Sequence, residues 1–220
     1  MPALIDLSHT IHDGLVTFKG LPAPVICDYL SRADSRKNYE AGTEFQIGRI
    51  DMVSNTGTYI DCPFHRYADG KDLSETALER FVNIPAVVVR VDHRSRIDVR
   101  ASDFDGVDVF GKAVLVDTGW SRHWKTPQYF ENHSFLTAEA AERLRDRGAV
   151  LVGIDSHNID DTRARNSRPV HTILLREEIL IVEHLRGLEL LPERELTFSA
   201  VPPKFTGVGT FPVRAFAQVP

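Results

Sequence analysis

The chain has 220 residues, 42% of them hydrophobic and 26% charged, with a formal net charge of −5 and a pI near 6.0. This length fits one α/β domain, so we expect a single domain over residues 1–220. The mild negative charge gives no reason to expect nucleic acid or an anionic membrane as a partner. No stretch approaches the roughly 20 apolar residues that a membrane span needs. The N-terminus has no secretion signal, and the two cysteines, Cys27 and Cys62, form no disulfide pattern, so we expect a reduced, cytoplasmic protein.

Short strands are predicted through the first half of the chain. They share apolar or β-branched runs, and most are bounded by turn residues or charged segments. The predicted strands are residues 3–7, a stretch from Val16 onward, 44–53, 86–91 and 112–117.

A strand–helix–strand unit is predicted over residues 112–154. Thr137 is suited to the N-cap of its helix, and Gly148 lies where a glycine commonly ends one. A second helix is expected to begin near Pro169, because proline fits a first helical turn, and to lead into a buried strand over 179–182. These elements indicate an α/β fold with a single mixed sheet and βα units. The β-rich start argues against a simple doubly wound sheet.

The segment that begins at Asn55 and ends at His65 is the strongest candidate for a site. In an extended chain, Tyr59 and Asp61 project to the same side as Asn55. A proline turn follows, so the carboxylate of Asp61 and the imidazole of His65 can converge on one ligand. A carboxylate can bind a metal or orient a base, and an imidazole can move protons near neutral pH. The structural alternative is that Asp61 caps a turn and His65 packs against Tyr67.

Two later residues carry the same chemistry. Glu183 directly follows a predicted buried strand, where a carboxylate needs a cation, a metal or hydrogen-bond donors to offset its desolvation. His171 lies at the start of the preceding predicted helix, and a short helix-to-strand return could bring the two together. The structural alternatives are that Glu183 pairs with Arg168 or Arg176 and that His171 faces solvent.

Taken together, these residues resemble the cyclase family of metal-dependent hydrolases, which includes bacterial kynurenine formamidase (arylformamidase) and isatin hydrolase. The family signature is His-x-Gly-Thr-His-x-Asp-x-Pro-x-His. The chain matches it at Gly57-Thr58, Asp61, Pro63 and His65. Further matches in the same order are Asp6–His9, Leu78–Phe81, Thr118–Trp120, Gly153–Asp155, Pro169–His171 and Ile181–Glu183. The resemblance implies the swivelling β/β/α-like fold of that family.

The chain departs from the signature at two positions. Asn55 stands where the signature has its first histidine, and Tyr59 stands where it has its second. In the family, the residue that matches His65 transfers protons, and the two missing histidines bind metal. The resemblance implies that the remaining metal ligands are Asp61, His171 and Glu183.

Two accounts of the metal follow from this departure. With a divalent metal (Mn, Zn or Mg), the loss of two imidazoles makes the site harder and favours Mn²⁺ or Mg²⁺ over Zn²⁺. Bound water would then attack a carbonyl while His65 carries the proton. Without a metal, one of the neighbouring carboxylates Asp61 and Glu183 would take up a proton. Tyr59 and Asn55 could then hydrogen-bond a carbonyl oxygen in place of the metal.

The expected function is arylformamidase-like: a hydrolase that cleaves a C–N or C–O bond of a small carbonyl compound. His65 is the expected acid/base, and Tyr59 and Asn55 are the further candidate catalytic residues. Two alternatives use the same scaffold, namely a metal-independent lyase or isomerase and a non-catalytic small-molecule-binding protein.

The pocket and the assembly are predicted more coarsely. Aromatic side chains suit an aromatic substrate, and the candidates to line the pocket are Phe18, Phe64 and Trp120. His157 follows the predicted strand that ends at Asp155, where open α/β sheets place ligand groups, although it could equally be a solvent-facing loop residue. The resemblance also implies a homo-oligomer, a dimer or tetramer, with the pocket near a subunit interface.

Overall fold

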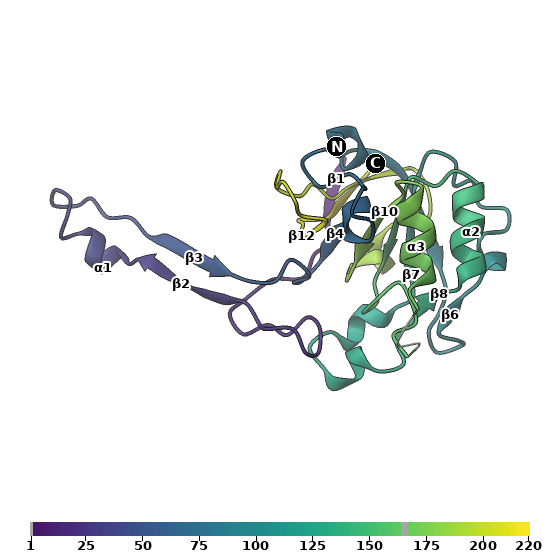
Figure 1. Ribbon diagram of the computed structural model, residues 1–220, viewed down its shortest axis with the longest axis horizontal. Helices are drawn as coiled ribbons and strands as arrows, with labels where there is room; N and C mark the ends of the chain where they lie inside the picture. The colour runs from purple at the N-terminus through teal and green to yellow at the C-terminus, as the bar shows by residue number, and fades with distance from the viewer. Residues whose placement is uncertain (1, 164–166) are drawn as a thin grey trace.

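The computed structural model describes residues 2–163 and 167–220. Its centre is a nine-stranded mixed sheet in the order β1-β13-β11-β5-β7-β9-β10-β4-β12 (Figure 1). This sheet confirms the predicted mixed α/β class. Its strands are β1 (Ala3–Asp6), β4 (Tyr59–Asp61), β5 (Ile84–Arg90), β7 (Ala113–Asp117), β9 (Leu151–Ile154), β10 (Leu180–Glu183), β11 (Leu196–Ser199), β12 (Thr210–Pro212) and β13 (Phe216–Val219).

The four strands β5, β7, β9 and β10 run parallel at the centre of the sheet. Their side chains alternate between two hydrophobic cores. In β7, for example, Val114 and Val116 belong to one core, whereas Leu115 belongs to the other. Strands buried on both faces read as continuous apolar runs, which explains why the sequence reveals them clearly.

Helices α2 (Ala138–Asp146) and α3 (Pro169–Arg176) cover one face of these strands (Figure 1). The Thr137 hydroxyl accepts a hydrogen bond from the Ala140 amide, and Gly148 follows the helix with a φ of +77°. The predicted ends of this helix are thus confirmed. A short parallel pair, β6 (Asp98–Val99) with β8 (Phe135–Leu136), flanks α2. None of the described helices is long and apolar enough to cross a membrane.

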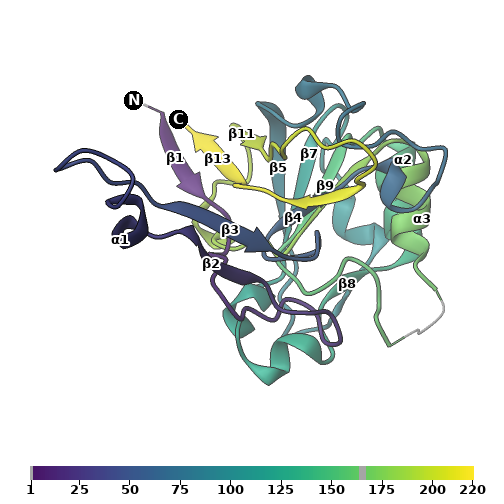
Figure 2. The ribbon, with the colours of Figure 1, turned by 60° about the vertical axis from the view of Figure 1, so that its left-hand side comes forward.

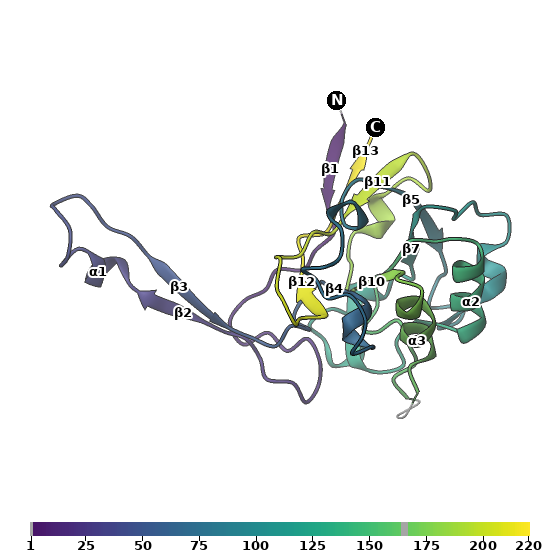
Figure 3. The same ribbon diagram turned by 45° about the horizontal axis from the view of Figure 1, so that its top comes forward.

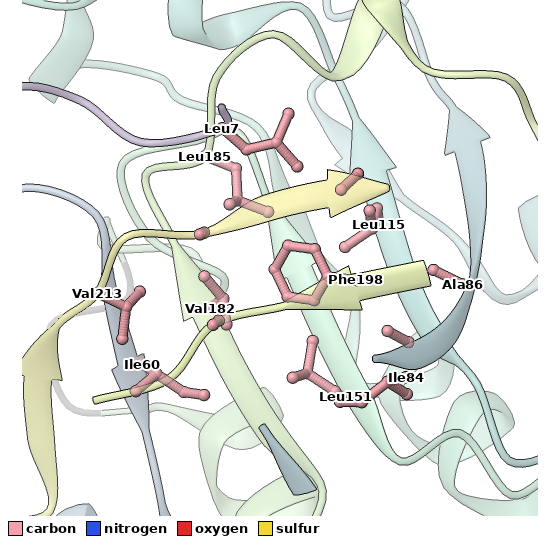
Figure 4. Packing of buried hydrophobic residues seen from close by; sticks show 14 of the residues in the cluster. Leu7, Ile60, Ile84, Ala86, Leu115, Leu151, Val182, Leu185, Phe198 and Val213 are labelled. Carbon is pink, nitrogen blue, oxygen red and sulfur yellow. The ribbon is translucent and has the colours of Figure 1, made fainter. Parts of the chain in front are cut away.

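The second core lies inside the curl of the sheet (Figure 4). It joins Phe198 of β11 to Leu115 of β7, Val182 of β10 and Ile60 of β4. Because strands from both halves of the sheet contribute, burying these side chains fixes β4 beside β10. This pairing determines where the candidate site forms.

An arm of two antiparallel strands, β2 (Val25–Leu30) and β3 (Ile47–Asp51), projects from the body with the short helix α1 (Arg32–Ser35) near its tip (Figures 1–3). The prediction of a strand from Val16 onward is wrong, since the strand begins only at Val25. The predicted strand over 44–53 shortens to β3, and it pairs in the arm, outside the main sheet. Most side chains of β2 and β3 are exposed, so their apolar pattern does not mark a core of this chain.

Candidate active site

Strand β4 lies between β10 and β12, antiparallel to both. This register places Asp61 opposite Ile181 and Thr210, and Tyr59 opposite Glu183 and Pro212. Only residues 59–61 of the predicted extended segment form a strand, because Gly57 adopts a φ of +68° that breaks the extension. Asn55 nevertheless lies on the same cavity as Tyr59.

A cavity of about 540 Å³ opens beside these strands. It is lined by residues from the two parts of the chain that the sequence marked as candidates. They include Phe18, Asn55, Tyr59, His65, Asn158, Arg168, His171 and Glu183. A second cavity of about 570 Å³, near the ends of β5 and β7, is lined by none of the predicted site residues. We therefore assign the candidate site to the first cavity.

Asp61 lies fully buried beneath the cavity. Its Oδ1 accepts a 2.5 Å hydrogen bond from the Thr210 hydroxyl, whereas its Oδ2 has no hydrogen-bond partner among the described residues. His65 Nδ1 and His171 Nε2 each lie 3.7 Å from one of these oxygens. Burial acts to raise the pKa of Asp61, but the two imidazoles outweigh it and lower that pKa. Asp61 is therefore a buried carboxylate that keeps its charge and has one uncommitted oxygen.

His171 is held by an aspartate that the sequence did not single out. Asp160 accepts hydrogen bonds from the amides of Val170 and His171 at the start of α3, and its Oδ2 lies 2.6 Å from His171 Nδ1. This contact fixes the imidazole so that Nε2 faces Asp61 Oδ2 and Glu183 Oε1, the latter at 3.8 Å. Burial acts to lower the pKa of His171, but the hydrogen bond to Asp160 and the nearby negative charges of Asp61 and Glu183 outweigh it and raise the pKa to about 10. Without a cation, the imidazole is therefore protonated between the carboxylates.

His65 ends a 3₁₀ turn, and its side chain is about one-third exposed to the cavity (34%). Its Nδ1 lies 2.7 Å from the Thr210 hydroxyl oxygen. Because that hydroxyl donates its one hydrogen to Asp61, Nδ1 must carry the proton of the His65–Thr210 bond. When His65 is neutral, its Nε2 is therefore the basic nitrogen. The backbone of Gly209 packs against the turn so closely that a Cβ there would lie 2.2 Å from the His65 amide nitrogen.

Glu183 lies at the end of β10 with both oxygens occupied. Oε1 accepts a 2.6 Å hydrogen bond from the Ile159 amide, and Oε2 accepts from the Tyr59 hydroxyl at 2.5 Å and from Asn158 Nδ2 at 3.3 Å. Burial raises the pKa of Glu183 to about 7. Burial and the negative charge of Glu183 also raise the pKa of Tyr59 well above its usual value, so the phenol stays protonated.

Two of the three predicted aromatic lining residues lie elsewhere. Phe18 lines the cavity and stacks on His157 with a ring separation of 4.5 Å. Phe64 instead packs against the core inside the sheet, and Trp120 is buried, with its indole nitrogen donating to the Tyr129 carbonyl. Neither side chain is part of the cavity lining, because the 3₁₀ turn Pro63–His65 and the turn after β7 direct them into the interior. His157 is also buried rather than solvent-facing.

Comparison with known proteins is consistent across sequence and structure. The sequence model of one family, described as "Putative cyclase", matches residues 5–161. The chain belongs to the cyclase family. It is 27% identical to the kynurenine formamidase of Bacillus cereus over 214 residues, which is 96% of this chain and 95% of the relative. It is 28% identical to the kynurenine formamidase of Geobacillus thermodenitrificans over 183 residues, which is 82% of this chain and 84% of the relative.

Solved structures of the cyclase family confirm the predicted fold. Isatin hydrolase A from Ralstonia solanacearum superposes with a TM-score of 0.83 at 24% identity, covering 100% of this chain and 92% of that one. A predicted metal-dependent hydrolase from Bacillus stearothermophilus has a TM-score of 0.79 at 26% identity, covering 99% of this chain and 98% of that one.

Three side chains of the site lie close enough together to hold a metal ion. One ligand atom from each of Asp61, His65 and His171 lies within 4.8 Å of the others. The unpaired, buried oxygen of Asp61 and the oriented Nε2 of His171 are donors suited to a divalent cation. Glu183, the third ligand that the resemblance implies, is not part of this group. The donor set fits a cation, and the predicted role of Glu183 as a ligand stays a prediction.

Proposed function

We propose that this protein is a hydrolase that cleaves an amide-type C–N bond, or an analogous C–O bond, of a small carbonyl compound, in the manner of an arylformamidase. The observation that carries the proposal is the Asp61–Thr210–His65 hydrogen-bonded chain at the cavity. It leaves Nε2 of His65 as the basic nitrogen, while the Asp61 carboxylate at the other end of the chain keeps one free oxygen. The kynurenine formamidases among the relatives support the same bond type.

In this proposal each group has a separate role. Asp61 and His171 would hold a divalent cation, which when bound supplies Lewis acidity toward the substrate carbonyl and acidifies water. His65 Nε2 takes a proton from the water that adds to the carbonyl carbon and returns it to the nitrogen that leaves as the C–N bond breaks, while Thr210 keeps the ring in the correct tautomer. Phe18 offers an aromatic face on the cavity wall. The metal-independent alternative would need the Tyr59 hydroxyl as a donor to substrate, but Glu183 already accepts from that hydroxyl.

The test is a panel of N-formyl aromatic amines, lactams and lactones assayed with protein supplied with Mn²⁺ or Zn²⁺. We expect turnover of at least one member. We expect His65→Gln to lower kcat by about 10²- to 10⁴-fold, the range typical of lost proton transfer. KM should change little, because Gln retains the size of the side chain. The exposed residue His12 gives the matched control, His12→Gln. No turnover across the panel, or wild-type kcat in His65→Gln, would overturn the proposal.

We also propose that the active form is a homo-oligomer built through the arm. A hairpin of two strands alone is marginally stable in water, yet the arm presents an unusual amount of apolar surface. Its exposed apolar side chains are Val25, Ile26, Tyr29, Tyr39, Phe45, Ile47 and Ile50. The loop that carries Phe18 and lines the cavity leads directly into the arm. A second copy related by a two-fold axis would present an identical apolar arm to this one and cover it.

Light scattering during size-exclusion chromatography tests this assembly. We expect a mass that is a multiple of the 24.7 kDa chain. The double variant Ile47→Lys/Ile50→Lys should run as a monomer, since two charges on the arm oppose burial. Leu190→Lys, at an exposed apolar position outside the arm, should leave the mass unchanged. A monomeric wild-type protein, or an arm variant with unchanged mass, would contradict the proposal.

A further inference from the structure

The two buried carboxylates of the site, Asp61 and Glu183, differ in the number of hydrogen bonds that they accept. Asp61 has one oxygen without a hydrogen-bond partner among the described residues, and that oxygen faces His171 Nε2. Glu183 receives three hydrogen bonds, from Tyr59, Asn158 and the Ile159 amide. A buried polar atom left unpaired calls for a ligand, whereas a carboxylate with three donors is already satisfied.

We infer that Tyr59 is an affinity-determining residue that withholds Glu183 from the bound cation. This inference deepens the proposed function, because it concerns the donor set of the same site. The donors left for a cation are then centred on Asp61 and His171, and Glu183 serves as an acceptor within the protein instead of as a ligand.

The position of Tyr59 makes this competition direct. Tyr59 and Glu183 are register partners on adjacent strands, and both line the cavity. The phenol is 2% exposed, so the hydrogen bond is shielded from water. A phenol cannot replace the imidazole that the family signature places here, because it stays protonated and donates where an imidazole would accept. The same substitution therefore removes one ligand and engages a second.

Glu183 is also held by a second segment of the chain. The Ile159 amide and the Asn158 side chain come from the loop after β9, and they fix the carboxylate between β4 and that loop. Glu183 consequently does not join the group formed by Asp61, His65 and His171, whose ligand atoms lie within 4.8 Å of one another. Of the three donors to Glu183, the Tyr59 hydroxyl is the one that can be removed by mutation without altering the backbone or the loop after β9.

The test is a double-mutant cycle of cation affinity without substrate. Chelator-stripped wild type, Tyr59→Phe, Glu183→Gln and the double variant are each titrated with Mn²⁺ and with Zn²⁺ by isothermal calorimetry. We expect Tyr59→Phe to bind about 10- to 100-fold more tightly, which corresponds to releasing one hydrogen bond to a charged group. Glu183→Gln should change wild-type affinity by no more than about twofold. In the Tyr59→Phe background it should abolish the gain.

Tyr129→Phe is the matched control, since Tyr129 is also buried and its hydroxyl pairs with His184 Nδ1 at 2.8 Å. Its cation affinity should equal that of wild type. The inference is overturned if Tyr59→Phe binds no more tightly than wild type, if Glu183→Gln alone weakens binding about 10-fold or more, or if none of the proteins binds either ion. Because no substrate is present, these results are independent of the hydrolysis assay. Inactive protein with the expected affinities would overturn the proposed function alone.

Discussion

Asp61→Asn is expected to weaken divalent cation binding by at least about 100-fold and to lower kcat by about 10³-fold, while the fold is retained. Even outer partners of metal ligands contribute 10- to 100-fold to affinity or activity, and Asp61 lies closer to the expected cation than they do. Asparagine keeps the shape and can still accept from Thr210. It removes the negative charge and can place an amide donor where the free oxygen faces His171.

Calorimetric titration with Mn²⁺ and a kcat measurement on the best substrate check this expectation. Asp72→Asn is the matched control, because Asp72 is also buried and hydrogen-bonded but does not belong to the group that Asp61 forms with His65 and His171. Its cation affinity and kcat should be those of wild type. If Asp61→Asn retains activity within about 10-fold of wild type, Asp61 is not central to the reaction, and the assignment of this cavity as the active site fails.

The features predicted most accurately from the sequence are those that depend on neighbouring residues in the chain. Thr137 and Gly148 delimit α2 because a cap hydroxyl and a left-handed glycine act within one turn of the helix. Strand β7 is predicted at the correct residues because a strand buried on both faces has no polar interruptions. The resemblance to the family predicts that Asp61, His171 and Glu183 lie close together. The periodicity of the sequence cannot predict this, because it carries no information on contacts between distant segments.

The parts of the site that were missed depend on strand pairing and loop geometry. Thr210 reaches Asp61 and His65 only because β12 pairs with β4, and nothing near Thr210 in the sequence indicates that register. Asp160 holds His171 by capping α3 across a loop, so its role depends on where that loop returns. An acidic residue about ten positions before a helix that starts with proline is the one local signal available. Many surface loops share that signal.

The arm shows a different limit of prediction from sequence. The alternating residues of 44–53 predict a strand half-buried by its own chain, and the structure instead places β3 in an exposed hairpin. Alternation of apolar and polar residues predicts that one face of a strand is buried, but it does not predict whether the same chain or another molecule buries that face. Phe64 and Trp120 illustrate the same ambiguity within the body, since aromatic character suits a pocket wall and a core equally.

A cluster of buried neutral histidines beside the cavity is expected to make the protein less stable in mild acid. Burial lowers the pKa of His9 and of His157 to about 3, and it lowers the pKa of His184 well below its usual value. His133 shifts in the same direction, also through burial. The unfolded chain binds these protons near pH 6.5 and the folded chain does not. Their contribution to stability is therefore complete above pH 6.5 and is lost as the pH falls below it.

Three carboxyl groups act in the opposite direction, and one of them is Asp117, whose pKa burial raises. Burial raises the pKa of Glu183 to about 7 and that of Asp155 to about 6, so near pH 5 these groups hold protons in the folded chain that the unfolded chain releases. The histidines with lowered pKa values, which also include His123, outnumber these carboxyls, so the unfolded chain binds more protons than the folded chain between about pH 6 and 5. Each excess proton corresponds to about 1.4 kcal/mol per pH unit, so the free energy of unfolding should fall by on the order of 1–3 kcal/mol per unit in this range.

Urea unfolding of chelator-treated protein between pH 7.5 and 5.0 measures this slope. A loss of that size is a measurable fraction of the 5–15 kcal/mol typical of a domain, so the urea concentration at the unfolding midpoint should fall clearly as the pH falls. His157→Gln removes one buried titrating group and should reduce the slope by about one proton, whereas His12→Gln, at an exposed site, should leave it unchanged. A free energy of unfolding that stays level or rises from pH 6.5 to 5.0 would contradict the expectation. It would mean that the imidazoles stacked between Phe18, Tyr129 and Trp124 accept protons within the folded protein.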